Sequence, residues 1–144
     1  MPEWKREGSA PEDRKTLVYR GSSMYPTFRE LDVLSYRNDR PLRAGDVIAY
    51  SSPDHGRITV HRITRKSGED IITQGDNCRS PDPDPVSPAS VLGRIDTFNR
   101  NGTVLTVHGD GPGLAYAIGC HVFCRLRPAI FGIIGPVYRR LVIR

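Results

Sequence analysis

Seven short segments constrain the fold most, because each is rich in valine, isoleucine, threonine or tyrosine and each ends near a turn-forming residue. Their bounds are residues 16–20, 31–37, 46–52, 57–64, 70–74, 91–98 and 103–108. β-Branched and aromatic residues fit the pleated surface of a sheet, whereas glycine, proline, asparagine and aspartate end strands. Gly 14 and Pro 12 among 144 residues favour turns over long helices. The pattern predicts a mostly β fold, a sandwich or a barrel, over residues 16–108.

Two tight turns and one stiff loop are predicted between these strands. The run "RAGD" precedes Val47, and residues 99–102 contain Asn101-Gly102, a dipeptide typical of two-residue hairpin loops. Residues 77–90 hold four prolines, too many for a sheet ladder. This loop is either a stiff surface connection or a rigid support for acidic side chains.

The sequence on either side of the β-rich region has a different character. Residues 1–15 are polar and contain no apolar core of a secretory signal, so a flexible arm is predicted. Residues 109–144 contain two apolar runs, 114–124 and 129–143, each shorter than the roughly 20 residues that span a bilayer. Two short helices are predicted, the second starting at Pro128. Because this tail has five arginines and one aspartate, it either packs across the β-rich domain, which we favour, or lies on an anionic membrane.

Charge and cysteine content narrow the classes of function. The net charge of +5 suits an anionic partner, but the arginines are dispersed and no aromatic residues alternate with them, which disfavours nucleic-acid binding. The cysteines, Cys78, Cys120 and Cys124, are odd in number and form no Cys-x-x-Cys pair. We therefore expect neither a disulfide framework nor a zinc knuckle, and nothing in the sequence implies another cofactor.

One serine and one histidine are candidates for nucleophilic chemistry. Ser23 lies in "RGSSMYPTFR", where Gly21 and Pro26 favour a bend that exposes its hydroxyl. Idle turns have the same composition, so the serine needs a base to become a nucleophile. His61, in the middle of "RITVHRIT", is the best candidate base.

Three carboxylates on the proline-rich loop could orient such a base. A histidine base works best when an acceptor holds its second nitrogen, which fixes the tautomer and stabilises the imidazolium. The stretch "TQGDNCRSPDPDP" offers Asp76, Asp82 and Asp84 for this role, and the prolines would hold them still. The residues alone do not choose among the three.

Taken in order, "GSSMYPT", "RPLRAGDVIAY", "VHRI" and "GDN", with an aspartate six positions after Asp76, resemble the signal-peptidase family of serine proteases. The resemblance covers roughly residues 18–96. Histidine in "VHRI" resembles the branch found in archaea, in the endoplasmic reticulum and in some Gram-positive bacteria, whereas other branches have lysine there. The resemblance implies that Ser23 is the nucleophile, His61 the general base and Asp82 its orienting partner.

The resemblance also implies supporting roles and one departure. Asp76 is then a second carboxylate that shapes the site, and Met24 packs beneath it. Many members have serine two positions before the nucleophile, where this chain has Gly21. The oxyanion hole is therefore expected to use backbone N–H groups, including that of Ser23, unless the neighbouring Ser22 hydroxyl assists.

The expected function is that of a serine endopeptidase with a mostly β, signal-peptidase-like catalytic domain. It would cleave a peptide or precursor protein after small residues in an extended segment, as in signal-peptide processing. The alternative is a non-catalytic module of the same fold that binds an extended peptide. Because residues 1–15 carry no anchor, the expected location is a membrane surface contacted through residues 109–144, with a cytoplasmic location as the alternative.

Overall fold

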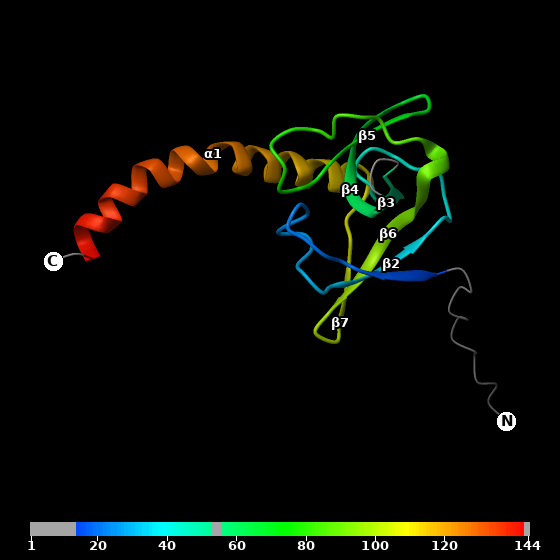
Figure 1. Cartoon of the computed structure of the whole chain (residues 1–144), viewed down its shortest axis with the longest axis horizontal. Coiled ribbons are helices and arrows are strands. Elements are labelled where there is room, and N and C mark those ends of the chain that lie inside the picture. Colours follow the sequence, from blue (N-terminus) through cyan, green and yellow to red (C-terminus); the bar gives the residue numbers. More distant parts are fainter. Residues whose placement is uncertain (1–13, 53–55, 143–144) are drawn as a thin grey trace.

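The computed structural model describes residues 14–52 and 56–142, with side chains as far as Pro128 (Figure 1). Each predicted segment contains one strand, so the mostly β prediction is confirmed. Most of the arm expected at residues 1–15 lies outside the described residues, but Lys15 already belongs to the first strand. The elements are β1 (Lys15–Val18), β2 (Val33–Arg37), β3 (Val47–Ser51), β4 (Ile58–Ser67), β5 (Asp70–Gln74), the short 3-10 helix Pro88–Ser90, β6 (Val91–Arg100), β7 (Thr103–Thr106) and α1 (Asp110–Val142).

All the strands belong to one antiparallel sheet, in the order β1-β2-β6-β3-β4-β5. The long strand β6 organises this sheet. One edge of β6 pairs with β2, while the other pairs first with β3 and then, beyond residue 96, with β7. The strands thus form a single sheet, and β1 and β5 are the two ends of this strand order. The signal-peptidase-like barrel stays a prediction.

The sheet has an apolar cluster on each face of β3. Alternate side chains of a strand point to opposite faces. Val47 and Ala49 accordingly join one cluster, and Ile48 and Tyr50 join the other. The first cluster contains Tyr19, Met24, Phe28, Leu34, Val60, Ile95, Phe98 and Val107, and the second contains Ile63, Ile71 and Val86. Burial on both faces makes β3 and the adjoining part of β4 the most enclosed part of the sheet.

Both tight turns form where they were predicted. Asn101 and Gly102 have φ values of 52° and 84°, as a two-residue hairpin turn between β6 and β7 requires. Gly45, in "RAGD", has a φ of 97°, and a Cβ on it would overlap the backbone of Asp110. Glycine is therefore needed at this position both for the turn and for the close approach of the chain that begins α1.

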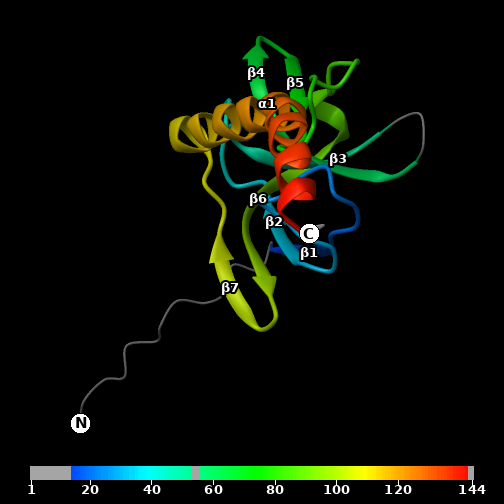
Figure 2. The ribbon, with the colours of Figure 1, turned by 90° about the vertical axis from the view of Figure 1, so that its left-hand side faces the viewer.

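The C-terminal region differs from the prediction of two short helices. It forms a single helix of 33 residues, and Pro128 lies within it instead of starting a second helix. A proline removes one backbone hydrogen bond of a helix and tends to bend it, which does not require the helix to end. Figures 1 and 2 show α1 starting beside β4 and then extending away from the sheet. Among the described residues, no helix combines the length and apolarity needed to cross a bilayer.

Candidate active site

His61 and Asp82 come together at the second apolar cluster. His61 is carried by β4 and is 9% exposed, and its Nδ1 lies 2.6 Å from Asp82 Oδ2. The proline-rich loop brings Asp82 to this position because the Asp82 N–H donates to the carbonyl of Thr73 on β5, at 2.8 Å. Further along, the loop pairs again with β5 between Ile71 and Val86. The loop is therefore anchored to β5 at Asp82 and again at Val86.

Two further hydroxyl groups donate to the same oxygen of Asp82. Thr73 Oγ1 lies 2.6 Å and the Tyr50 hydroxyl 3.1 Å from Asp82 Oδ2. Burial alone would raise the pKa of Asp82, but the hydrogen bonds from His61, Thr73 and Tyr50 and the charge of His61 outweigh it and lower the pKa. Burial and the neighbouring carboxylate raise the pKa of Tyr50 to about 12, so it stays a donor. Asp82 is thus held as a carboxylate.

Ser23 lies on the turn between β1 and β2, and both its backbone and its side chain are held. Its carbonyl oxygen accepts the Asn77 N–H at 2.7 Å, and its Oγ lies 3.2 Å from the hydroxyl of Tyr19. The next residue, Met24, is fully buried in the first apolar cluster. Met24 therefore anchors the turn in the first apolar cluster.

Gly75 is the point at which Ser23 and His61 approach each other. A Cβ on Gly75 would lie 2.5 Å from the Ser23 carbonyl oxygen and 3.1 Å from His61 Nε2. The turn needs glycine here because any side chain would push these groups apart. No hydrogen bond joins Ser23 Oγ to His61 within the described residues, and Tyr19 is the side chain that Ser23 Oγ contacts.

Asp76 faces away from His61 and forms a buried ion pair with Arg62. Arg62 Nε and Nη2 each lie 2.9 Å from one carboxylate oxygen of Asp76, and both residues are at most 1% exposed. Thr27 Oγ1 donates to the same carboxylate. Arg62 Nη1 donates to the carbonyls of Gly45 and His108, at 2.8 and 2.7 Å. These contacts of Arg62 with Asp76, Gly45 and His108 form a clamp that holds the turn after β5. Arg62 lies in "VHRI", but the sequence did not indicate its role.

The other predicted site residues are at the surface. Ser22 is exposed, and it contributes its carbonyl oxygen, which accepts from Asn77 Nδ2 at 3.1 Å. Asp84 is also exposed and lines a cavity of about 580 Å³ that has His61 and Asp82 in its wall. Of the three loop carboxylates, Asp82 is therefore the one that contacts His61.

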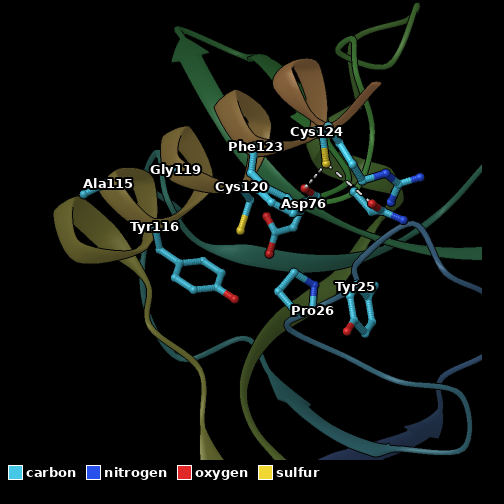
Figure 3. Close-up of a pocket in the computed structure, with 11 residues that line it drawn as sticks. Tyr25, Pro26, Asp76, Ala115, Tyr116, Gly119, Cys120, Phe123 and Cys124 are labelled. Carbon is cyan, nitrogen blue, oxygen red and sulfur yellow. Dashed lines mark hydrogen bonds between the residues drawn. The ribbon is translucent and has the colours of Figure 1, made fainter. Parts of the chain in front are cut away.

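Helix α1 packs against the far side of the Gly75–Asn77 turn. His121 Nε2 lies 3.1 Å from the carbonyl oxygen of Gly75, and Cys124 Sγ lies 3.5 Å from Asn77 Oδ1. A cavity of about 360 Å³ lies between the helix and this turn, and Figure 3 shows Cys120 and Tyr116 pointing into it beside Asp76. The predicted packing of the C-terminal region against the β-rich domain is thus found for the first turns of α1.

Neither a metal-binding cluster in the described residues nor a related protein indicates what the site does. Within residues 14–52 and 56–142, no three histidine, cysteine, aspartate or glutamate side chains gather into a possible metal site. No protein-family model matches the chain, and no curated protein matches it either.

We predict that Gly75→Ala pushes the Ser23 turn away from His61. Because the contacted atom is backbone, the strain cannot be relieved by a rotamer change, and we expect a loss of about 1–3 kcal/mol in the free energy of unfolding. Urea unfolding measures this loss. The control is Gly119→Ala in α1, where a Cβ meets nothing within 4 Å and where alanine favours the helix. Equal stability of Gly75→Ala and the wild type would contradict the close approach.

Asp82→Asn should destabilise the fold in a pH-dependent way. A carboxyl whose pKa is lowered on folding stabilises the protein above its ordinary value of 3.8 and loses this contribution as the pH falls through the folded value. At neutral pH we expect Asp82→Asn to lower the free energy of unfolding by about 1–3 kcal/mol. This loss should persist in weak acid and shrink only below pH 3.8. Unfolding of Asp82→Asn and of the exposed-site control Asp84→Asn at several pH values measures it. If the difference in unfolding free energy between the wild type and Asp82→Asn already disappears in weak acid, the ionised carboxylate is not its source.

Proposed function

We propose that this chain is a signal-peptidase-like serine endopeptidase that cleaves a peptide or precursor protein with Ser23, His61 and Asp82. The observation that carries the proposal is the 2.6 Å contact between His61 Nδ1 and Asp82 Oδ2. This contact occupies one ring nitrogen and leaves Nε2 free beside Gly75, where the backbone of Ser23 also lies. A serine, an imidazole with one free nitrogen and a carboxylate on the other nitrogen are the parts of a Ser-His-Asp hydrolase.

In the proposed reaction, Ser23 Oγ attacks the scissile carbonyl carbon while its proton passes to His61 Nε2. The imidazolium that forms is stabilised by the Asp82 carboxylate, whose lowered pKa keeps it charged. His61 then gives the proton to the leaving amine, and the new amino terminus departs. Water then attacks the acyl-enzyme ester while one of its protons passes to His61 Nε2. The ester bond to Ser23 Oγ breaks, His61 returns the proton to this oxygen, and the new carboxyl terminus departs.

Two features support accommodation of a substrate. In the described part of the chain, the Ser23 N–H has no hydrogen-bond acceptor, so it is available to stabilise an oxyanion. The cavity of about 580 Å³ has His61 and Asp82, but not Ser23, in its wall, so it offers space for the part of a substrate that extends past His61. The preference for small residues before the cleaved bond comes from the family resemblance.

We predict that an electrophilic serine probe, such as a fluorophosphonate, labels the chain at Ser23. Ser23→Ala should abolish labelling and peptide hydrolysis while the protein stays folded, since the half-buried turn hydroxyl contributes little packing. In serine proteases the loss of the nucleophile lowers kcat by about 10⁶-fold. Ser22→Ala is the matched control, because it removes the adjacent hydroxyl and should retain labelling.

The same experiment tests the rival function, a peptide-binding module without catalysis. One observation favours this rival, because Ser23 Oγ contacts Tyr19 and no hydrogen bond joins it to His61. Peptide binding with no labelling of Ser23 would support the module and contradict the protease. In apo structures, however, hydrogen bonds between a nucleophile and its base are often long and tighten only when substrate binds.

We also propose that the outer face of α1, defined by Ile118, Val122 and Leu126, rests on an anionic membrane surface. These side chains are 49–57% exposed, and they follow each other at spacings of four residues. Arg125, three residues after Val122 on the same side of the helix, is also exposed, and no acidic residue follows Asp110 in the chain. An apolar stripe beside cationic side chains is typical of a helix lying in a membrane interface.

Binding to lipid vesicles tests this surface. The full chain should co-sediment with vesicles that contain phosphatidylglycerol and much less with vesicles of phosphatidylcholine alone. Leu126→Ser should weaken partitioning by about tenfold or more, and Arg125→Gln by about fivefold. Val104→Ser and Arg65→Gln remove exposed groups of the same kinds from the sheet and serve as controls.

The outcome that would contradict membrane contact is equally specific. A second copy of the chain could cover the same apolar face. If the chain forms a dimer that Leu126→Ser dissociates, and if it does not bind phosphatidylglycerol vesicles, the face is a protein interface. Sedimentation velocity without lipid distinguishes the two.

A further inference from the structure

Tyr19 is a buried residue whose hydroxyl touches the atom proposed as the nucleophile. The side chain is 4% exposed and packs on Phe28, with ring centroids 5.6 Å apart. Its hydroxyl oxygen lies 2.9 Å from the Met24 N–H and 3.2 Å from Ser23 Oγ. One phenol therefore contacts both the nucleophilic oxygen and the backbone of the residue that follows it.

The direction of the hydrogen bond between Tyr19 and Ser23 follows from the donors present. The Met24 N–H can only donate, so the phenol oxygen accepts from it. The phenol proton then needs an acceptor of its own, since a buried hydroxyl without one is costly. Within the described residues, Ser23 Oγ is the acceptor in reach. Tyr19 is thus the donor and Ser23 Oγ the acceptor.

This direction leaves the proton of Ser23 free. A serine hydroxyl has one proton and two acceptor lone pairs. With a lone pair occupied by Tyr19, the Ser23 proton can point toward His61 Nε2, which lies on the Gly75 side of the turn. A donor to Oγ also favours the deprotonated form of the nucleophile.

Tyr19 is itself held firmly at its backbone. Its N–H donates to the carbonyl of Asp32 at 2.8 Å, and its carbonyl accepts from the Leu31 N–H at 2.9 Å. Asp32 is in turn paired with Arg100 on β6, at 2.6 Å. The hydroxyl of Tyr19 is therefore a fixed reference point for the Ser23 side chain.

We propose that Tyr19 is a positioning residue, which donates a hydrogen bond to Ser23 Oγ and so fixes the side-chain rotamer in which the Ser23 proton can pass to His61. The catalytic consequence rests on the proposed Ser-His-Asp function. The hydrogen bond itself does not, and it can be tested in a variant that needs no peptidase activity.

The test uses Ser23→Cys in the full chain, with the alkylation rate of the introduced thiol followed against pH by iodoacetamide and site-resolved mass spectrometry. A donor at Tyr19 stabilises the thiolate. Adding Tyr19→Phe should therefore move the midpoint of the alkylation curve upward, by roughly one pH unit for a hydrogen bond of ordinary strength to a charged group. Tyr36→Phe is the control, because it removes a half-buried phenol hydroxyl that does not contact Ser23.

A second substitution covers the case in which Tyr19→Phe fails to fold. Placing 3-fluorotyrosine at position 19 keeps the ring packing and the hydroxyl but makes the phenol a stronger donor, so the midpoint should move downward. A midpoint that responds neither to 3-fluorotyrosine nor to Tyr19→Phe overturns the proposal. A merely structural role of Tyr19 would change stability without this opposite pair of shifts.

The catalytic consequence has a separate measurement. With Ser23 present, Tyr19→Phe should slow the reaction with the serine probe by about tenfold, whereas Tyr36→Phe should not. If the thiol midpoints shift as expected but wild-type Ser23 does not react at all, the Tyr19 hydrogen bond stands and the proposed peptidase function falls. If Ser23 reacts equally fast with and without the Tyr19 hydroxyl, the positioning role is overturned and the peptidase function stands.

Discussion

The buried pair of Arg62 and Asp76 is the interaction on which the rest of the structure depends. The arginine binds both oxygens of the carboxylate and also the carbonyls of Gly45 and His108. It thereby joins β4, the turn before β3, the turn after β5 and the segment that leads into α1. Removing one partner would leave a buried charge without compensation, which typically costs about 3–5 kcal/mol. The clamp therefore fixes the relative positions of four segments that are distant in sequence.

The clamp and the candidate site are two sides of the same strand. His61 and Arg62 are consecutive on β4, so their side chains point to opposite faces of the sheet. On one face Arg62 holds Asp76, and on the other His61 meets Asp82. The Asp76 turn then presents Gly75 to His61, Asn77 to the Ser23 carbonyl and its far side to α1. A change at the α1 contact can thus reach the turn that lies between Ser23 and His61.

The sequence predicted the strands well because residue type and turn punctuation are local signals, and the residues at Asn101-Gly102 need no distant partner. Motifs in a fixed order also singled out His61 and Asp82, which lie in contact, but not the Thr73 and Tyr50 hydroxyls that donate to the same carboxylate. Contacts that depend on the tertiary arrangement were missed. The alternation of side chains along β4 places Arg62 and His61 on opposite faces, but it does not indicate that Asp76 is the partner of Arg62. Nothing in the local sequence indicates that the Tyr19 hydroxyl reaches Ser23. The single helix was not predicted because proline favours the first position of a helix, whereas α1 continues through Pro128.

The proposed role of Ser23 and His61 as one catalytic unit is tested most directly by a double-mutant cycle on peptide hydrolysis. Rates would be measured for the wild type, Ser23→Ala, His61→Ala and the double variant, each shown to be folded by circular dichroism. Residues that act as a unit are strongly non-additive, since losing either one already removes the shared function. We expect the double variant to be about as slow as either single variant. Independent, multiplicative losses, or full activity in either single variant, would contradict the proposed catalytic unit.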